Sequence, residues 1–187
     1  MEHPLDQWLC YRDRLPLRVD PLPQPPDELE LRHWRDVNFR ALAAVATLDE
    51  RHPHADGGSG SDDADIERLH QKMDLVLDLL GALLRQSRTE LAEQAVCLSR
   101  EGLSWPSVLI SPPPGTPVRI ELHLHPCAPQ ALVWGGEIVG THQNETWARF
   151  APMGDALLTE LERFVFTRHR RSVAGARSPV GWGDAAQ

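Results

Sequence analysis

The sequence has few cysteines, no long apolar run and no excess of positive charge, and each absence excludes a class of protein. Its three cysteines, Cys10, Cys97 and Cys127, are odd in number and widely spaced. We therefore expect free thiols in a reducing cytoplasm rather than a disulfide framework. The longest apolar run, Leu75–Leu84, covers about ten residues, roughly half of what a membrane span needs. The net charge of -8 argues against a general nucleic-acid binder.

The N-terminal residues 1–26 combine aromatic and apolar residues with a string of prolines. No apolar h-region occurs there, so no secretory signal peptide is expected. The prolines exclude a regular helix and favour an extended chain. We predict a loose Pro-rich arm whose Trp8 packs onto the core. The five prolines that carry this prediction are Pro16, Pro21, Pro23, Pro25 and Pro26.

Residues 27–91 have the spacing of a heptad repeat in two predicted helices, which a glycine-rich loop at 52–61 joins into a hairpin. Apolar residues in steps of three and four form a stripe that faces a partner when helices supercoil. We call this stripe the heptad seam and expect it to build a homo-oligomer. Asn38 either fixes the register of that oligomer or lies at the margin of an amphipathic face. The seam consists of Leu31, Trp34, Asn38, Ala41, Val45, Leu48, Ile66, Leu69, Met73, Val76, Leu80 and Leu83.

From about residue 90 the apolar period changes from helical to strand-like. Several close-spaced strands with no helices between them predict an antiparallel sheet or barrel. A last helix, from Asp155 to about Arg171, carries one broad apolar face that would cover the sheet. Residues 172–187 are rich in Gly, Ala, Ser and Pro and are predicted to be disordered. The predicted strands are Val96–Trp105, Val118–Leu124, Leu132–Thr141 and Thr146–Phe150.

The strand region resembles PilZ domains over about residues 89–171. Cys97-Leu-Ser-Arg-Glu-Gly102-Leu-Ser-Trp105 is similar to the D/N-x-S-x-x-G turn of that family. Pro114-Gly-Thr-Pro-Val-Arg-Ile-Glu-Leu122 and Leu132-Val-Trp-Gly-Gly-Glu-Ile-Val-Gly140 resemble two of its strands. Trp147-Ala-Arg-Phe150 and the terminal helix complete the order. The resemblance implies an α+β protein in which the heptad-repeat hairpin precedes a six-stranded antiparallel β-barrel and a C-terminal helix.

The same resemblance implies a site for cyclic di-GMP. The ligand-binding members of the PilZ family hold this nucleotide with an R-x-x-x-R pair and with the Asp/Asn and Ser of the turn. Ser99 and Gly102 match the turn, but Cys97 stands where a carboxylate or amide is expected, and a thiol is only a weak acceptor. Arg85 and Arg88 are three apart instead of four, and Arg100 lies inside the turn motif.

A heptad-bearing segment beside such a barrel resembles the atypical, tetramer-forming PilZ subgroup. Two functional hypotheses follow. The first is a non-enzymatic signalling adaptor without a cofactor, which self-assembles, most simply as a tetramer, and acts through an unidentified protein partner. The second is a cyclic di-GMP receptor with an altered site built from Arg85, Arg88, Ser99 and Arg100.

Other motifs carry weaker chemistry. His123, His125 and Cys127 alternate along one strand face, but their span and Pro126 argue against a metal site. A triad of Ser99, His142 and Asp155 lacks a nucleophile elbow, so we expect no catalysis. The basic end of the last helix complements its dipole or offers a docking surface for an acidic partner. Its arginines are Arg163, Arg168, Arg170 and Arg171.

Overall fold

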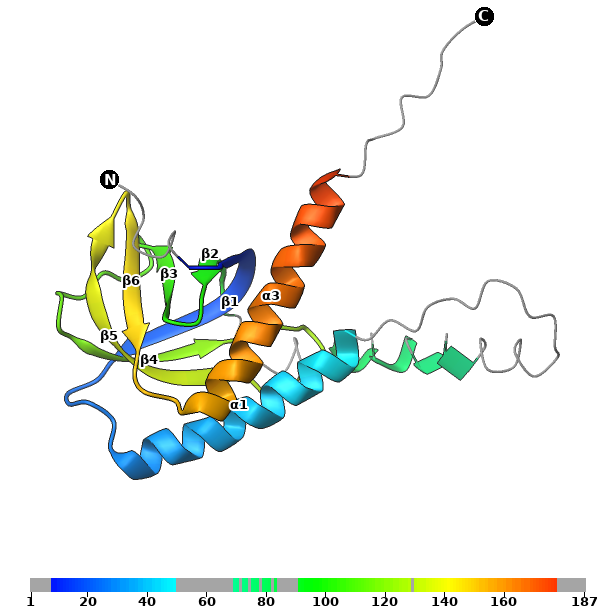
Figure 1. Cartoon of the computed structure of the whole chain (residues 1–187), viewed down its shortest axis with the longest axis horizontal. Helices are drawn as coiled ribbons and strands as arrows, with labels where there is room; N and C mark the ends of the chain where they lie inside the picture. The colour runs from blue at the N-terminus through cyan, green and yellow to red at the C-terminus, as the bar shows by residue number, and fades with distance from the viewer. Residues whose placement is uncertain are drawn as a thin grey trace, which may run out of the picture.

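Six antiparallel strands close into a barrel (Figure 1). One helix follows the first strand of the chain, and another follows the last strand. The computed structural model describes residues 8–49, 91–128 and 130–177, together with 69–70, 72–73, 75–77, 79–81 and 83. The strand order around the barrel is β1-β2-β3-β6-β5-β4. The predicted α+β class and six-stranded barrel are confirmed. The elements are β1 (Tyr11–Pro21), α1 (Glu28–Asp49), β2 (Glu93–Leu98), β3 (Gly102–Pro106), β4 (Pro117–Leu122), β5 (Leu132–His142), β6 (Glu145–Phe150) and α3 (Asp155–Arg177).

The Pro-rich N-terminal segment supplies β1, so the prediction that residues 1–26 form a loose arm is wrong for Tyr11–Pro21. Residues up to Pro16 pair with β2, and those from Leu17 pair with β4. Each half of the strand is therefore paired along one edge only, which tolerates a proline that has no N–H to donate. Leu15, Leu17 and Val19 alternate inward and are buried. This alternation stabilises β1 in the barrel despite the prolines.

The predicted run Val96–Trp105 is two strands, β2 and β3, which a short turn at Ser99–Glu101 separates. Both strands contribute fully buried side chains, including Leu98, Leu103 and Trp105. Because both flanks of the turn are apolar, periodicity alone did not locate it. The turn brings β3 alongside β6, where Gly102 lies opposite Arg149.

Helix α1 packs against β5 of its own chain. It begins with a reciprocal capping box in which Asp27 Oδ1 accepts from the Glu30 N–H at 2.8 Å and Glu30 Oε2 accepts from the Asp27 N–H at 3.1 Å. At Gly135 of β5 a Cβ would lie 2.7 Å from Pro26 Cγ and 3.1 Å from the Trp34 ring. Glycine at 135 thus permits the close approach of the helix.

The heptad seam of α1 is an intrachain surface, which corrects its assignment to an oligomer interface. Asn38, Ala41 and Val45 are each 1% exposed within the single chain. They are therefore inaccessible to a second copy. Leu31, Trp34 and Leu48 are also partly buried on this side of the helix. The amphipathic pattern correctly located the apolar face of α1 but not the surface that covers it.

Helix α3 contacts both α1 and β1 (Figure 1). Leu157, Leu161 and Val165 are buried as predicted, while Leu158 and Phe164 are partly buried against the same core. The helix extends to Arg177, so the prediction of disorder is wrong for residues 172–177. The remaining residues of that predicted tail lie outside the described residues.

The described residues between 69 and 83 are helical, and most of their apolar side chains are exposed. The loop at 52–61, the start of the second predicted helix and Ile66 lie outside the described residues, so the hairpin remains a prediction. A hydrogen bond of 3.2 Å from Cys127 Sγ to the Leu77 carbonyl links this helical segment to the β4–β5 connection. Within the described part of the chain, no helix is long and apolar enough to cross a membrane.

Candidate functional site

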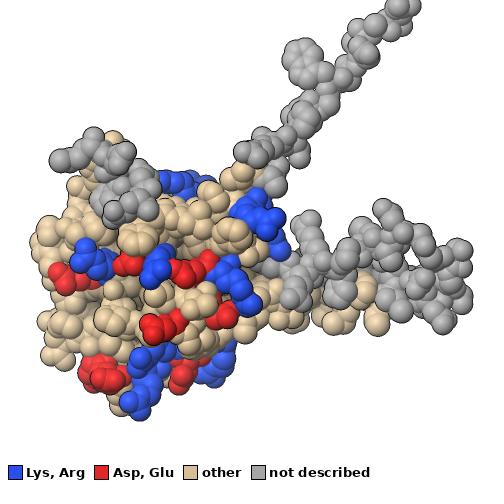
Figure 2. Space-filling model, viewed as in Figure 1, with Lys and Arg blue, Asp and Glu red and all other residues tan. Residues whose placement is uncertain are grey.

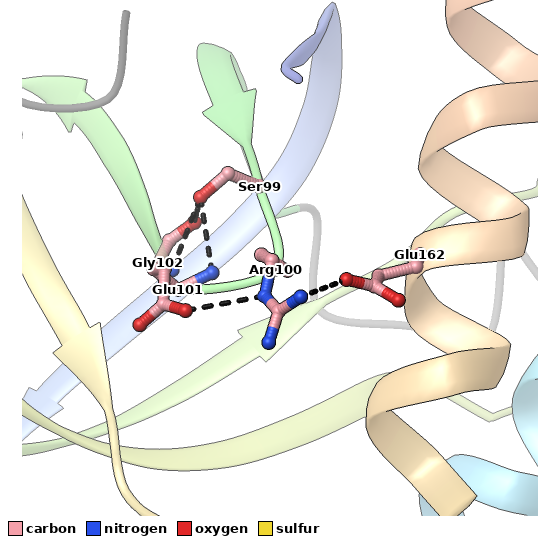
Figure 3. Close-up of polar contacts among 5 residues, drawn as sticks. All are labelled: Ser99, Arg100, Glu101, Gly102 and Glu162. Atoms are coloured by element: carbon pink, nitrogen blue, oxygen red, sulfur yellow. Dashed lines mark hydrogen bonds and ion pairs between the residues drawn. The ribbon is translucent and has the colours of Figure 1, made fainter. Parts of the chain in front are cut away.

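The β2–β3 turn, at the position of the PilZ-like motif, is organised by Ser99 (Figure 3). Ser99 Oγ accepts from the N–H groups of Glu101 and Gly102, each at 3.2 Å, and donates to the Gly102 carbonyl at 3.2 Å. The Ser99 N–H donates to the same carbonyl at 2.9 Å. Ser99 has no exposed surface. Its hydroxyl therefore stabilises the turn and is turned away from solvent.

Gly102 lets β3 approach β6 more closely than any side chain would allow. A Cβ at position 102 would lie 2.1 Å from the Ala148 carbonyl oxygen. That atom belongs to the backbone of β6 and cannot move aside without breaking the ladder. The motif's Ser and Gly thus have clear structural roles in this chain.

Arg100 projects from the turn towards α3, where its guanidinium pairs with Glu162 (Figure 3). The Arg100 Nε also donates to Glu101 Oε1 at 3.2 Å. On another side the guanidinium lies 5.6 Å from the centre of the Trp8 ring, within cation–π range. One cation is therefore held by two carboxylates and an aromatic ring, all from its own chain.

Cys97 occupies the motif position where Asp or Asn is expected, and it is 2% exposed. Its neighbours across the ladders are Arg12 and Ser104. A hydrogen bond with Cys10, reinforced by burial, raises the pKa of the Cys97 thiol far above its usual range. The thiol is therefore neutral, so it provides neither the charge nor the acceptor strength of a carboxylate.

The structure assembles only part of the predicted site. Cys97, Ser99, Arg100 and Gly102 lie together in β2, β3 and their turn, while Arg85 and Arg88 fall outside the described residues. Sequence reasoning missed three contributors, Cys10, Trp8 as the ring beside Arg100, and Glu162. Cys10 and Trp8 were assigned to a loose arm because of the prolines that follow them. Glu162 lies on α3, and no sequence pattern connects it to Arg100.

The residues considered for metal binding or catalysis have structural contacts. His125 Nδ1 accepts from the Cys127 N–H at 3.1 Å, in a turn that breaks the predicted strand face. Among the described residues, no group of three or more His, Cys, Asp or Glu side chains is placed to hold a metal. Of the suggested triad, Ser99 is committed to its turn, while His142 ends β5 and Asp155 begins α3.

Comparison with known families shows where this barrel belongs. The family described as "Atypical PilZ domain, cyclic di-GMP receptor" (tPilZ) matches residues 39–178, from the middle of α1 to the end of α3. The chain is an atypical PilZ domain protein. This family consists of receptor domains, and no enzyme family is indicated. Strand β1 lies outside the matched region.

Two solved structures of PilZ domains are similar to this chain to different degrees. A pathogenic protein from Xanthomonas campestris, described as a tetrameric PilZ domain self-assembled via a helical bundle, is 27% identical with a TM-score of 0.64. The likeness covers 90% of this chain and 92% of that one. The PilZ domain of YcgR from Escherichia coli, solved with c-di-GMP, is 13% identical with a TM-score of 0.35, over 49% of this chain and 84% of that one. No curated protein matches the sequence.

Proposed function

We propose that this atypical PilZ protein is a non-enzymatic signalling adaptor that self-assembles through its helical segment at 69–83 and acts through a protein partner. The observation that carries the proposal is the exposure of that segment. Its seam residues Leu69, Met73, Val76, Leu80 and Leu83 are between 48% and 60% exposed in the single chain. Leu75 and Leu79, outside the seam, are 59% and 57% exposed.

Exposure of so many apolar side chains of this helix to water is unfavourable in free energy. Burial of apolar surface contributes roughly 25 cal/mol per Å², so several large side chains provide a strong drive for association. A helix that is apolar over most of its circumference fits a bundle of several helices better than a two-helix contact. The Xanthomonas campestris protein is reported to assemble as a tetramer through a helical bundle. This similarity supports a homotetramer built on residues 69–83 of the present chain.

We also propose that the barrel does not hold cyclic di-GMP through its motif turn. Three observations at the motif turn support this part of the proposal. Ser99 is fully buried and bonded to the turn backbone. Cys97 replaces a carboxylate or amide by a neutral, buried thiol. Arg100 is already paired with Glu162 and Glu101. A nucleotide that bound here would have to break the ion pairs of Arg100. It would also find no carboxylate at position 97 to accept hydrogen bonds from guanine.

The second candidate is a cyclic di-GMP receptor, which the description of the family favours. In that case Arg100 would exchange Glu162 for the nucleotide, since an ion pair with side chains 36% and 42% exposed is easily rearranged. Glu162→Gln would then release Arg100 and strengthen binding. Under the adaptor hypothesis the same variant gives a flat titration, as does the wild type.

Light scattering at micromolar concentration tests the assembly directly. One chain has a mass of 21.0 kDa. A measured mass several times this value, dropping on dilution, supports the proposal, and a monomer would contradict it.

A further inference from the structure

A groove between α1 and α3 has the chemistry of a binding site. Its volume is about 230 Å³. Leu42 and Ala46 of α1 and Phe164 of α3 give it apolar walls, while Arg163, Arg168 and Arg171 of α3 line it with positive charge. None of the described residues between 69 and 83 lines it. The groove is thus built from elements other than those proposed to assemble the oligomer.

Two of the groove's arginines have defined contacts with neighbouring side chains. Arg168 lies 5.4 Å from the centre of the Phe164 ring and 5.9 Å from that of Tyr11, so cation–π contacts fix it beside the apolar wall. Arg163 pairs with Glu160 at 2.8 Å, one turn away on the same helix, and its side chain is 68% exposed. Such a surface pair contributes little to stability and is readily exchanged for another carboxylate.

The local charge is opposite to that of the chain. The whole protein has a net charge of -8, yet among the described residues the groove is lined by three arginines and one acid, Glu160. Figure 2 shows basic side chains gathered over α3 near its C-terminal end, whereas acidic and basic side chains alternate over the barrel. This contrast favours an anionic occupant for the groove.

The size of the groove decides between kinds of anion. Pockets that enclose small molecules usually have volumes of about 300–1,000 Å³, so 230 Å³ is too little for a dinucleotide. It suits one or two apolar side chains that project from a larger surface. Carboxylates beside those anchors would then meet the arginine forks, which bind carboxylates with two parallel hydrogen bonds.

We propose that this groove docks an acidic amphipathic helix of a partner protein, with an apolar anchor between Ala46 and Phe164 and a flanking carboxylate on Arg163. Helix-in-groove recognition uses apolar anchors spaced along one helix face. The inference rests on the proposed adaptor function and deepens it, because it names the surface and the chemistry of the partner.

The test uses the full chain and a fluorescent synthetic amphipathic helical peptide, with leucine and phenylalanine on one face and glutamates beside them. Anisotropy should show saturable binding that weakens as salt rises. Arg163→Glu should weaken it by about tenfold or more, and Ala46→Trp should abolish it by filling the groove. Arg170→Glu is the matched control, because Arg170 stacks over Phe166 and does not line the groove. A peptide with glutamine in place of each glutamate should bind weakly.

The proposal is overturned if no saturable binding occurs, or if Arg170→Glu weakens binding as much as Arg163→Glu. It is also overturned if cyclic di-GMP displaces the peptide, or if Arg163→Glu lowers the oligomer mass without peptide, because the groove would then hold a nucleotide or a second copy. Arg163 is exposed, so its variant stays informative if Ala46→Trp fails to fold. Loss of peptide binding by an assembled protein refutes only the groove, whereas a monomeric wild type refutes the proposed function.

Discussion

Asn38 of α1 and Val133 of β5 exchange two hydrogen bonds, as two strand residues would. The Asn38 Nδ2 donates to the Val133 carbonyl at 2.8 Å, and Asn38 Oδ1 accepts from the Val133 N–H at 2.7 Å. Pairing between β5 and β6 begins only at Gly136. The side-chain amide therefore completes the edge of β5 where β6 has ended, and it attaches α1 to the barrel.

Replacing Asn38 by leucine should destabilise the protein strongly. The side chain keeps a similar volume but leaves the Val133 N–H and carbonyl buried without partners. Two such groups should lower the free energy of unfolding by about 2–4 kcal/mol, which urea denaturation followed by circular dichroism measures. His33→Ala on the exposed face of α1 serves as the control and should change it by less than about 0.5 kcal/mol. Equal stability of Asn38→Leu and wild type would show that the pair is dispensable.

The contact between Asn38 and Val133 illustrates which part of the fold could be predicted from the sequence. Spacing in steps of three and four correctly places Asn38, Ala41 and Val45 on one face of a helix. It carries no information on whether β5 or a second chain covers that face. The same limit applies to β1, because prolines disfavour a strand only where the missing N–H would be needed. For both α1 and β1, the structure depended on which element packs or pairs with the segment, and the residue composition of the segment did not reveal this.

Substitution of Leu80 by glutamate should dissociate the oligomer and leave the barrel folded. Leu80 is 48% exposed in the single chain, so a charge there costs little until helices pack over it. The mass from light scattering should fall towards 21.0 kDa while near-UV circular dichroism is unchanged. Val108→Glu is the matched control, since Val108 is 92% exposed in a loop, and its mass should equal that of the wild type. An oligomer that survives Leu80→Glu would exclude this helix as the interface.

Gly102→Ala should damage the barrel far more than Gly140→Ala. A methyl group at 102 would meet the Ala148 carbonyl oxygen at 2.1 Å, whereas nothing lies within 4 Å of a Cβ at 140. We expect Gly102→Ala to lower the free energy of unfolding by about 1–3 kcal/mol or more and Gly140→Ala to leave it nearly unchanged. Denaturant midpoints compare the two, and equal midpoints would refute the close approach of β3 and β6.

The Cys97 thiol should make the protein less stable in alkali. Its hydrogen bond with Cys10 and its burial raise its pKa in the folded state, so the folded protein holds this proton more tightly than the unfolded chain. The stabilisation is present below the ordinary thiol pKa of about 8.5 and is lost as pH rises above it. Between about pH 8 and about pH 10 the wild type should lose about 2 kcal/mol more than Cys97→Ala. Parallel pH profiles in urea denaturation would contradict the raised pKa.

The candidate site was predictable only in its local part. The order Cys97, Ser99, Gly102 located the turn, since a short motif reports residues close in sequence. The partner of Arg100, Glu162, is 62 positions away along the chain, on α3. The thiol contact between Cys10 and Cys97 depended on β1, which the prolines concealed. The residues of the turn could be predicted from the sequence. The partners that their side chains contact could be identified only from the folded structure.

A calorimetric titration of the assembled wild-type protein with cyclic di-GMP tests most directly whether the motif turn can hold this nucleotide. The contacts of Ser99, the neutral thiol of Cys97 and the ion pair of Arg100 with Glu162 predict no heat beyond dilution. Saturable heat that disappears in Ser99→Ala or Arg100→Ala, with both variants folded, would show that the turn binds cyclic di-GMP and that the protein is a receptor.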